Sequence, residues 1–127
     1  MYLHPELTDK IISCYYAVYN KLGYGFLEKV YENAMMIELR KNGIQAVQQK
    51  PIHVHYDDEE VGNYFADILV EDKVVLELKA GNVSDLQEEF ELQLTNYLKA
   101  TNYELGLLLL FGKKPVIKRK IFTNDLK

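Results

Sequence analysis

Charged residues interrupt two apolar segments that are typical of neighbouring β-strands, and this pattern restricts the fold more than any other. Asp67 lies within the segment YFADILV, residues 64–70, and Glu77 lies within VVLELK, residues 74–79. Apolar runs of this length are typical of buried strands. Because an unpaired carboxylate is costly to bury, two carboxylates side by side predict a cation between them.

Two interpretations of these charges are open at this level. In the first, Asp67 and Glu77 bind a hard divalent ion such as Mg²⁺, which prefers carboxylate oxygens and keeps positions for water and phosphate. In the second, Asp67 forms an ion pair with Lys79 across the two strands, and Glu77 lies at the rim. Lys79 is two residues from Glu77 and shares its strand face, so the amine lies near the carboxylates in both interpretations.

The length of the turn between the two strands decides whether a shared site can form. Side chains alternate along a strand, so a two-residue loop at 71–72 would send Asp67 and Glu77 to opposite faces of the sheet. A three-residue loop at 71–73, or a bulge in one strand, would place them side by side. A shared metal site therefore predicts one of these two arrangements.

Two helical segments add polar residues that we expect near the same site. Glu28 lies in the first turn of a helix that follows Gly25, on the side of Tyr31. Gln93 interrupts an apolar stripe of a later helix, and Tyr97 shares its face four residues on. A carboxylate and an amide in such positions indicate a polar cavity within the core.

Apolar periodicity, turn residues and helix caps predict the element order ααβββαββ. This order is that of an α+β fold, an α/β sandwich with a mixed sheet flanked by helices. The expected helices are one capped by Thr8 and ending at Gly23, one at 27–42 and one opened by Ser84 and ending near 101; the expected strands are 46–56, 61–70, 73–79, 105–111 and 116–122.

Four segments, taken together and in order, resemble a known family. GFLEKVYE, ADILV, LELKA and QLTNYLKA are similar to the GxxExxY family of the PD-(D/E)XK nuclease superfamily, and the resemblance extends over residues 7–122. Gln93 and Tyr97 also resemble the Gln-x-x-x-Tyr element of RecB-like nucleases. One departure is that Ala66 stands where the superfamily name has Pro, next to a metal ligand that is unchanged.

The resemblance implies a restriction-endonuclease-like core and Mg²⁺- or Mn²⁺-dependent hydrolysis of phosphodiester bonds in DNA. The expected catalytic residues are Asp67, Glu77, Lys79 and Gln93. The expected metal ligands are Asp67, Glu77, the carbonyl of Leu78, and Glu28 directly or through water. Tyr97 is expected to pack beneath the site or to contact a phosphate.

Net charge by itself does not indicate a nucleic-acid binder, because the chain carries −4 at pH 7. The basic residues are unevenly distributed, however, and five of the 15 fall in 113–120 without an acid. We expect Lys118, Arg119 and Lys120 to contact phosphate. The alternative is an edge strand that its lysines protect from aggregation.

Bulk properties exclude several other classes. A length of 127 residues predicts a single domain, 1–127, and the resemblance implies that this domain is nuclease-like. The single cysteine, Cys14, fits a reducing compartment, and no segment approaches about 20 apolar residues, so we expect a cytoplasmic protein without a membrane partner. His53 and His55 share a strand face, but no further Cys or His completes a zinc site.

The binding partners and the class of activity each allow more than one interpretation from the sequence. The tyrosines at helical spacing near the N-terminus indicate core or interface contacts, which leaves a homodimer open. We expect DNA as the substrate, with RNA as the alternative. A second class of function is a catalytically inactive binding or assembly module that has kept a nuclease scaffold, because fold does not establish activity.

Overall fold

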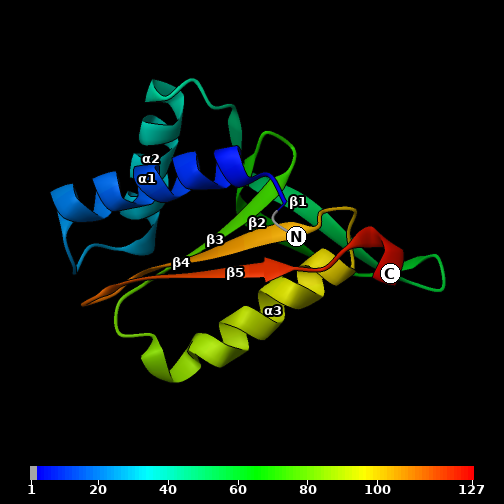
Figure 1. The fold of residues 1–127 in the computed structure, drawn as a ribbon. Coiled ribbons are helices and arrows are strands. Elements are labelled where there is room, and N and C mark those ends of the chain that lie inside the picture. The colour runs from blue at the N-terminus through cyan, green and yellow to red at the C-terminus, as the bar shows by residue number, and fades with distance from the viewer. Residues whose placement is uncertain (1–2) are drawn as a thin grey trace.

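The computed structural model describes residues 3–127 and shows a five-stranded sheet between two helical layers (Figure 1). Helices α1 (Pro5–Leu22) and α2 (Glu28–Lys41) cover one face, and α3 (Gln87–Lys99) covers the other. Short 3-10 turns lie at Ser84–Leu86 and Asn124–Leu126. None of the helices in this described part is both long and apolar enough to cross a membrane.

The sheet is mixed and its strands follow the order of the sequence. The strands are β1 (Ala46–Tyr56), β2 (Glu59–Val70), β3 (Val74–Ala80), β4 (Leu105–Phe111) and β5 (Pro115–Ile121). Only β3 and β4 are parallel, and α3 forms the crossover that a parallel pair needs. The predicted α+β sandwich and its element order are confirmed.

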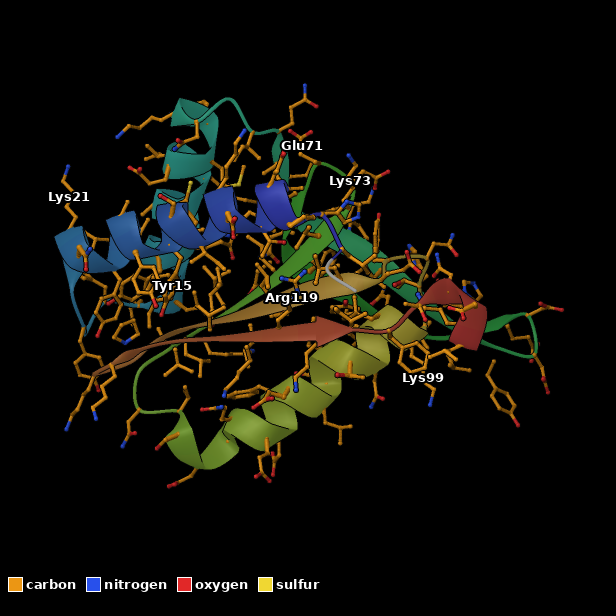
Figure 2. All side chains as sticks on the ribbon, in the orientation of Figure 1. Tyr15, Lys21, Glu71, Lys73, Lys99 and Arg119 are labelled. Carbon is orange, nitrogen blue, oxygen red and sulfur yellow. The ribbon has the colours of Figure 1, made fainter. Side chains whose placement is uncertain are left out.

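Two apolar clusters hold the layers together. All residues of β4 are buried, because side chains on one face pack against α1 and α2 while those on the other pack against α3. Tyr15 points from α1 toward the sheet (Figure 2), where its hydroxyl donates to the carbonyl of Leu110 and accepts from the N–H of Val116. These contacts fix α1 across β4 and β5.

The element boundaries differ from prediction mainly at helix starts. α1 begins at Pro5, about one turn before Thr8, because proline is well suited to the first helical position. Thr8 is buried inside the helix and is not its cap. The hydroxyl of Ser84 likewise contacts Asn82 instead of capping α3, which begins only after a 3-10 turn. The start of a helix depends on how the preceding segment approaches it, and a pattern of capping residues does not determine that approach.

Candidate functional site

The β2–β3 hairpin has the three-residue loop that a shared carboxylate site requires. Val70 lies opposite Val74, and Lys73 donates its N–H to the carbonyl of Val70 at 2.9 Å. Glu71 and Asp72 adopt left-handed backbone conformations, φ 53° and 52°, which close the loop. The register prediction is confirmed.

The two strands separate where the site residues begin. The paired positions end at Ile68 and Leu76, and the next residues along the strands are Asp67 and Glu77. Asp67 Oδ2 accepts a hydrogen bond from the N–H of Leu78 at 2.7 Å, and the Glu77 carboxylate accepts one from the backbone N–H of Asp67, which acts to lower the pKa of Glu77. Both carboxylates therefore lie in the gap between β2 and β3.

A break in strand alternation produces this gap. Ala66 and Leu69 both pack into the cluster against α3, although residues three apart face opposite sides of a regular strand. In the neighbouring strand, Gln49 is left-handed with φ 54°, and the ladder between β1 and β2 omits the pair Gln49–Asp67. The sheet is thus distorted at Asp67 in two adjacent strands.

Burial and mutual repulsion raise the pKa of all three predicted acids. The pKa of Glu77, which is 8% exposed, is raised to about 8 by burial and then by the charge of Asp67. Burial is also the main cause that raises the pKa of Asp67 and of Glu28. The charge of Lys79 acts in the opposite direction on each of the three. Each group therefore lies close enough to Lys79 to respond to its charge.

Two buried carboxylate oxygens at this site lack partners. Oε1 of Glu28 and Oε1 of Glu77 are buried without a hydrogen bond among the described residues. Such oxygens suit a cation, because burying an unpartnered carboxylate oxygen is costly. Within residues 3–127, however, no three His, Cys, Asp or Glu side chains converge closely enough to hold a metal ion. The acids therefore fit a cation without forming a closed set of carboxylate ligands.

The Gly25, Glu28 and Tyr31 pattern shapes the turn that begins α2. Gly25 has φ 115°, a conformation that L side chains rarely adopt. The buried hydroxyl of Tyr31 donates to the carbonyl of Gly23 at 2.6 Å and accepts from the N–H of Phe26 at 3.2 Å. Glu28 is the first residue of α2. Gly25 and Tyr31 thus have structural roles that place Glu28 beside the β2–β3 gap.

Lys79 does not form the predicted alternative ion pair. Among the described residues its ammonium makes no ion pair with Asp67, and it lies 4.8 Å from the centre of the Phe90 ring of α3. Val75 packs against α3, so Glu77 and Lys79, two and four residues on, project to the same side. The amine is therefore positioned beside the carboxylates without being neutralised by one of them.

The predicted positions of Gln93 and Tyr97 are realised only in part. Gln93 is exposed, so its place in an apolar stripe did not predict burial correctly. Its side chain lies near Tyr97 and acts to lower the pKa of that hydroxyl, which burial and then the charge of Glu77 raise. The Tyr97 ring stacks on Tyr64 with centroids 3.3 Å apart. Tyr97 therefore lies within electrostatic range of the acids, and Gln93 contacts it from the outer side.

The three basic residues of β5 do not form one strip. Strand alternation places Lys118 and Lys120 on the α3 side and Arg119 on the α1 side, where it donates to the carbonyl of Leu3 at 2.9 Å; Figure 2 shows Arg119 on the side of α1. Lys120 forms an ion pair with Glu91 of α3 at 2.5 Å. β5 is an edge strand, as the alternative interpretation proposed.

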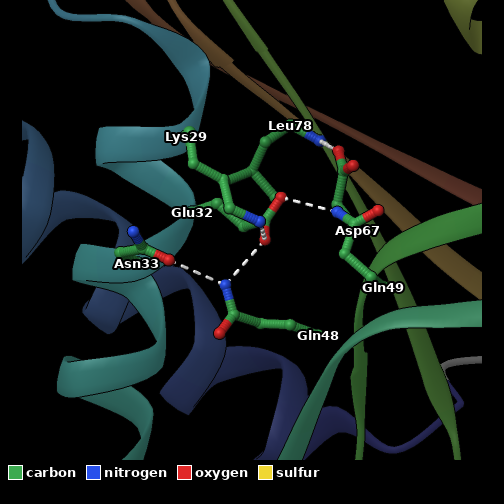
Figure 3. Close-up of polar contacts among 7 residues, drawn as sticks. All are labelled: Lys29, Glu32, Asn33, Gln48, Gln49, Asp67 and Leu78. Atoms are coloured by element: carbon green, nitrogen blue, oxygen red, sulfur yellow. Dashed lines mark hydrogen bonds and ion pairs between the residues drawn. The ribbon is translucent and has the colours of Figure 1, made fainter.

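A buried network beside Asp67 was not anticipated from the sequence. Glu32, which follows Tyr31 directly, accepts hydrogen bonds from Lys29, Gln48 and Gln49 (Figure 3). Its position four residues after Glu28 puts both acids on one side of α2, a spacing that was readable in advance. The contribution of Gln49 could not be predicted from the sequence, because it depends on the distortion of β1.

Comparison with known proteins identifies one family. The family model of the PD-(D/E)XK nuclease superfamily matches residues 5–121. Comparison with curated proteins and with solved structures gives no match. The family match covers every element from α1 to β5 and includes all the residues of the site described above.

Proposed function

Since the chain belongs to the PD-(D/E)XK nuclease superfamily, we propose that it is a Mg²⁺- or Mn²⁺-dependent nuclease of the GxxExxY type that hydrolyses phosphodiester bonds in DNA. Members of this superfamily generally hydrolyse phosphodiester bonds and typically use divalent metals. The observation that carries the proposal is the pair of buried, unpartnered oxygens of Glu28 and Glu77 beside Asp67. The preference for DNA over RNA follows from the family resemblance.

Four groups would hold the ion. Asp67 and Glu77 supply carboxylate oxygens from opposite sides of the β2–β3 gap. The N–H and C=O of a strand residue point to the same side, so the Leu78 carbonyl faces the gap into which its N–H donates. Glu28, which keeps a buried oxygen without a partner in residues 3–127, would bind the ion directly or through water. Oxygen ligands of this kind suit Mg²⁺ and Mn²⁺.

The remaining groups would bind and orient the substrate. When bound, the ion neutralises charge at the scissile phosphate and favours deprotonation of the attacking water. The Lys79 ammonium, which forms no ion pair with any described residue, holds a phosphate oxygen or orients the attacking water. Gln93 holds the Tyr97 hydroxyl, and Tyr97 borders the site on the side of α3. Lys118 attracts the phosphate backbone on the same face, whereas the charge of Lys120 is offset by its ion pair with Glu91.

Titration calorimetry tests the metal site before any substrate is known. Mn²⁺ and Mg²⁺ are titrated into the wild type, Asp67→Ala and the control Asp9→Ala, which removes an exposed aspartate of α1. We expect binding in the wild type and the control and its loss in Asp67→Ala. Equal binding by all three variants would contradict the site.

A cleavage assay then separates the enzyme from the inactive module. Single-stranded, duplex and branched DNA, with matched RNA, are incubated with the wild type in Mg²⁺ or Mn²⁺, and EDTA is the negative control. We expect metal-dependent cleavage of at least one DNA. Metal binding without cleavage of any substrate would favour a binding module built on the nuclease scaffold.

A further inference from the structure

Glu32 is a buried carboxylate whose oxygens are both occupied. It is 2% exposed and lies on α2, facing β1. Its Oε2 accepts from Lys29 Nζ at 2.8 Å and from Gln48 Nε2 at 2.7 Å, and its Oε1 accepts from Gln49 Nε2 at 2.9 Å. Glu32 thus differs from Glu28 and Glu77, which each keep an unpartnered oxygen. Both oxygens of Glu32 already accept hydrogen bonds from protein groups. We therefore do not assign Glu32 as a metal ligand.

Gln49 is held in an unfavourable backbone conformation at the same place. Its φ of 54° is left-handed, a conformation that residues other than glycine rarely adopt. Such strain persists only where surrounding contacts fix it, and it is concentrated at functional sites. The contact that fixes Gln49 is its hydrogen bond to Glu32.

The Gln49 amide also contacts Asp67. A glutamine amide carries two N–H donors. One donates to Glu32, and Figure 3 shows the same amide next to the Asp67 carboxylate, where its interaction acts to lower the pKa of Asp67. Asp67 therefore accepts a hydrogen bond from Leu78 of β3 and lies beside the Gln49 amide of β1.

We propose that Gln49 and Glu32 are positioning residues, which hold the Asp67 carboxylate in the β2–β3 gap where it can share a divalent ion with Glu77. This inference rests on the proposed function and adds to it a link from α2 through β1 to the metal site. Neither residue touches the ion. Because outer contacts orient the ligands of a metal, their loss weakens its binding, typically by about 10–100-fold.

Gln48 provides a matched control. It precedes Gln49, is also a glutamine and donates to the same Glu32, but its second contact is Asn33 of α2, and no contact with Asp67 is described. A purely structural role for the Glu32 network would make Gln48 and Gln49 equivalent. A positioning role makes only Gln49 important for the metal.

The test compares Gln49→Gly with Gln48→Gly by calorimetric titration of Mn²⁺. Glycine relieves the left-handed strain at position 49 but weakens a regular strand at 48, so the control is expected to be the less stable protein. We nevertheless expect the dissociation constant for Mn²⁺ to rise by about tenfold or more in Gln49→Gly and to change little in Gln48→Gly. Equal effects in the two variants would overturn the inference.

A second readout requires no metal. The Leu78 N–H is protected by its hydrogen bond to Asp67, so its hydrogen exchange, measured by NMR, reports whether Asp67 stays in place. We expect faster exchange at Leu78 in Gln49→Gly and not in Gln48→Gly. If wild-type protein bound no Mn²⁺, the proposed function would fail, while this exchange experiment would still decide whether Gln49 positions Asp67.

Discussion

Buried polar groups are treated differently on the two sides of this molecule. Beneath α1 and α2, the Tyr15 and Tyr31 hydroxyls both donate to carbonyls and accept from backbone N–H groups. At the β2–β3 gap, an oxygen of Glu28, an oxygen of Glu77 and the Tyr64 hydroxyl are buried without a partner in residues 3–127. Because nearly all buried polar groups in native proteins are paired, three unpartnered groups at one gap support the metal site proposed there, whereas Thr8 Oγ1 of α1 is an isolated exception among the described residues.

Stability and activity should therefore depend on different regions of the molecule. In the region around Tyr15 and Tyr31, the tyrosine region, the buried hydroxyls are hydrogen-bonded. Changes there should therefore alter the free energy of unfolding. The carboxylate region, Glu28, Asp67 and Glu77, keeps two oxygens without a hydrogen-bond partner in residues 3–127. Changes there should alter metal binding and catalysis while leaving the fold intact.

The largest effect is expected for the acids and Lys79. Asp67→Ala, Glu77→Ala or Lys79→Ala should each lower the rate of DNA cleavage by about 10³-fold, comparable to the loss of one preorganised electrostatic group. Circular dichroism and thermal unfolding should show a folded protein in each case. Cleavage that persists in Asp67→Ala would mean that the unpartnered oxygens do not mark an active site.

The opposite result is expected in the tyrosine region. Tyr31 is fully buried and its ring stacks on Phe111 with centroids 4.2 Å apart. Tyr31→Ala should therefore lower the free energy of unfolding by about 3–5 kcal/mol, measured by urea denaturation. Tyr31→Phe keeps the ring and should lose only about 1 kcal/mol for its hydrogen bonds. A loss in Tyr31→Ala no larger than in Tyr31→Phe would contradict the packing role.

The pH dependence of stability should reveal the raised pKa of Glu77. The pKa of Glu77 is raised from 4.5 to about 8 in the folded protein, so between these values the native state binds more protons than the unfolded state. Stability without metal should therefore fall as pH rises from about 5 to 8, and saturating Mg²⁺ should offset the loss. Glu77→Gln should flatten this part of the profile, and an unchanged profile would contradict the assignment.

The smallest effect concerns the basic residues of β5. Lys118→Gln should reduce the slope of log affinity against log salt by about 0.9 on duplex DNA, the value for one phosphate contact. Arg119→Gln should leave the slope unchanged, because Arg119 lies on the α1 side and contacts Leu3. Equal slopes for both variants and the wild type would assign β5 to edge protection alone.

Much of the fold and part of the site could be predicted from local pattern. Alternation of side chains required an odd offset between Asp67 and Glu77, and the three-residue loop supplies it. The strands predicted at 46–56 and 105–111 agree in full with the structure, because long apolar or alternating runs with clear turns are strong local signals. Helix starts were less accurate, since Pro5 and the 3-10 turn at Ser84–Leu86 displaced the expected caps.

The sequence by itself determined which charged residues interrupt the buried strands and that Glu77 and Lys79 share one strand face, because the second follows from a period of two along a regular strand. Only the tertiary structure decided that Arg119 contacts Leu3 while Lys120 pairs with Glu91, and that Glu32 is linked to Asp67 through a left-handed Gln49. Those contacts join residues distant in sequence, and the distortion of β1 and β2 that allows the second of them arises from packing between layers, which no local pattern records.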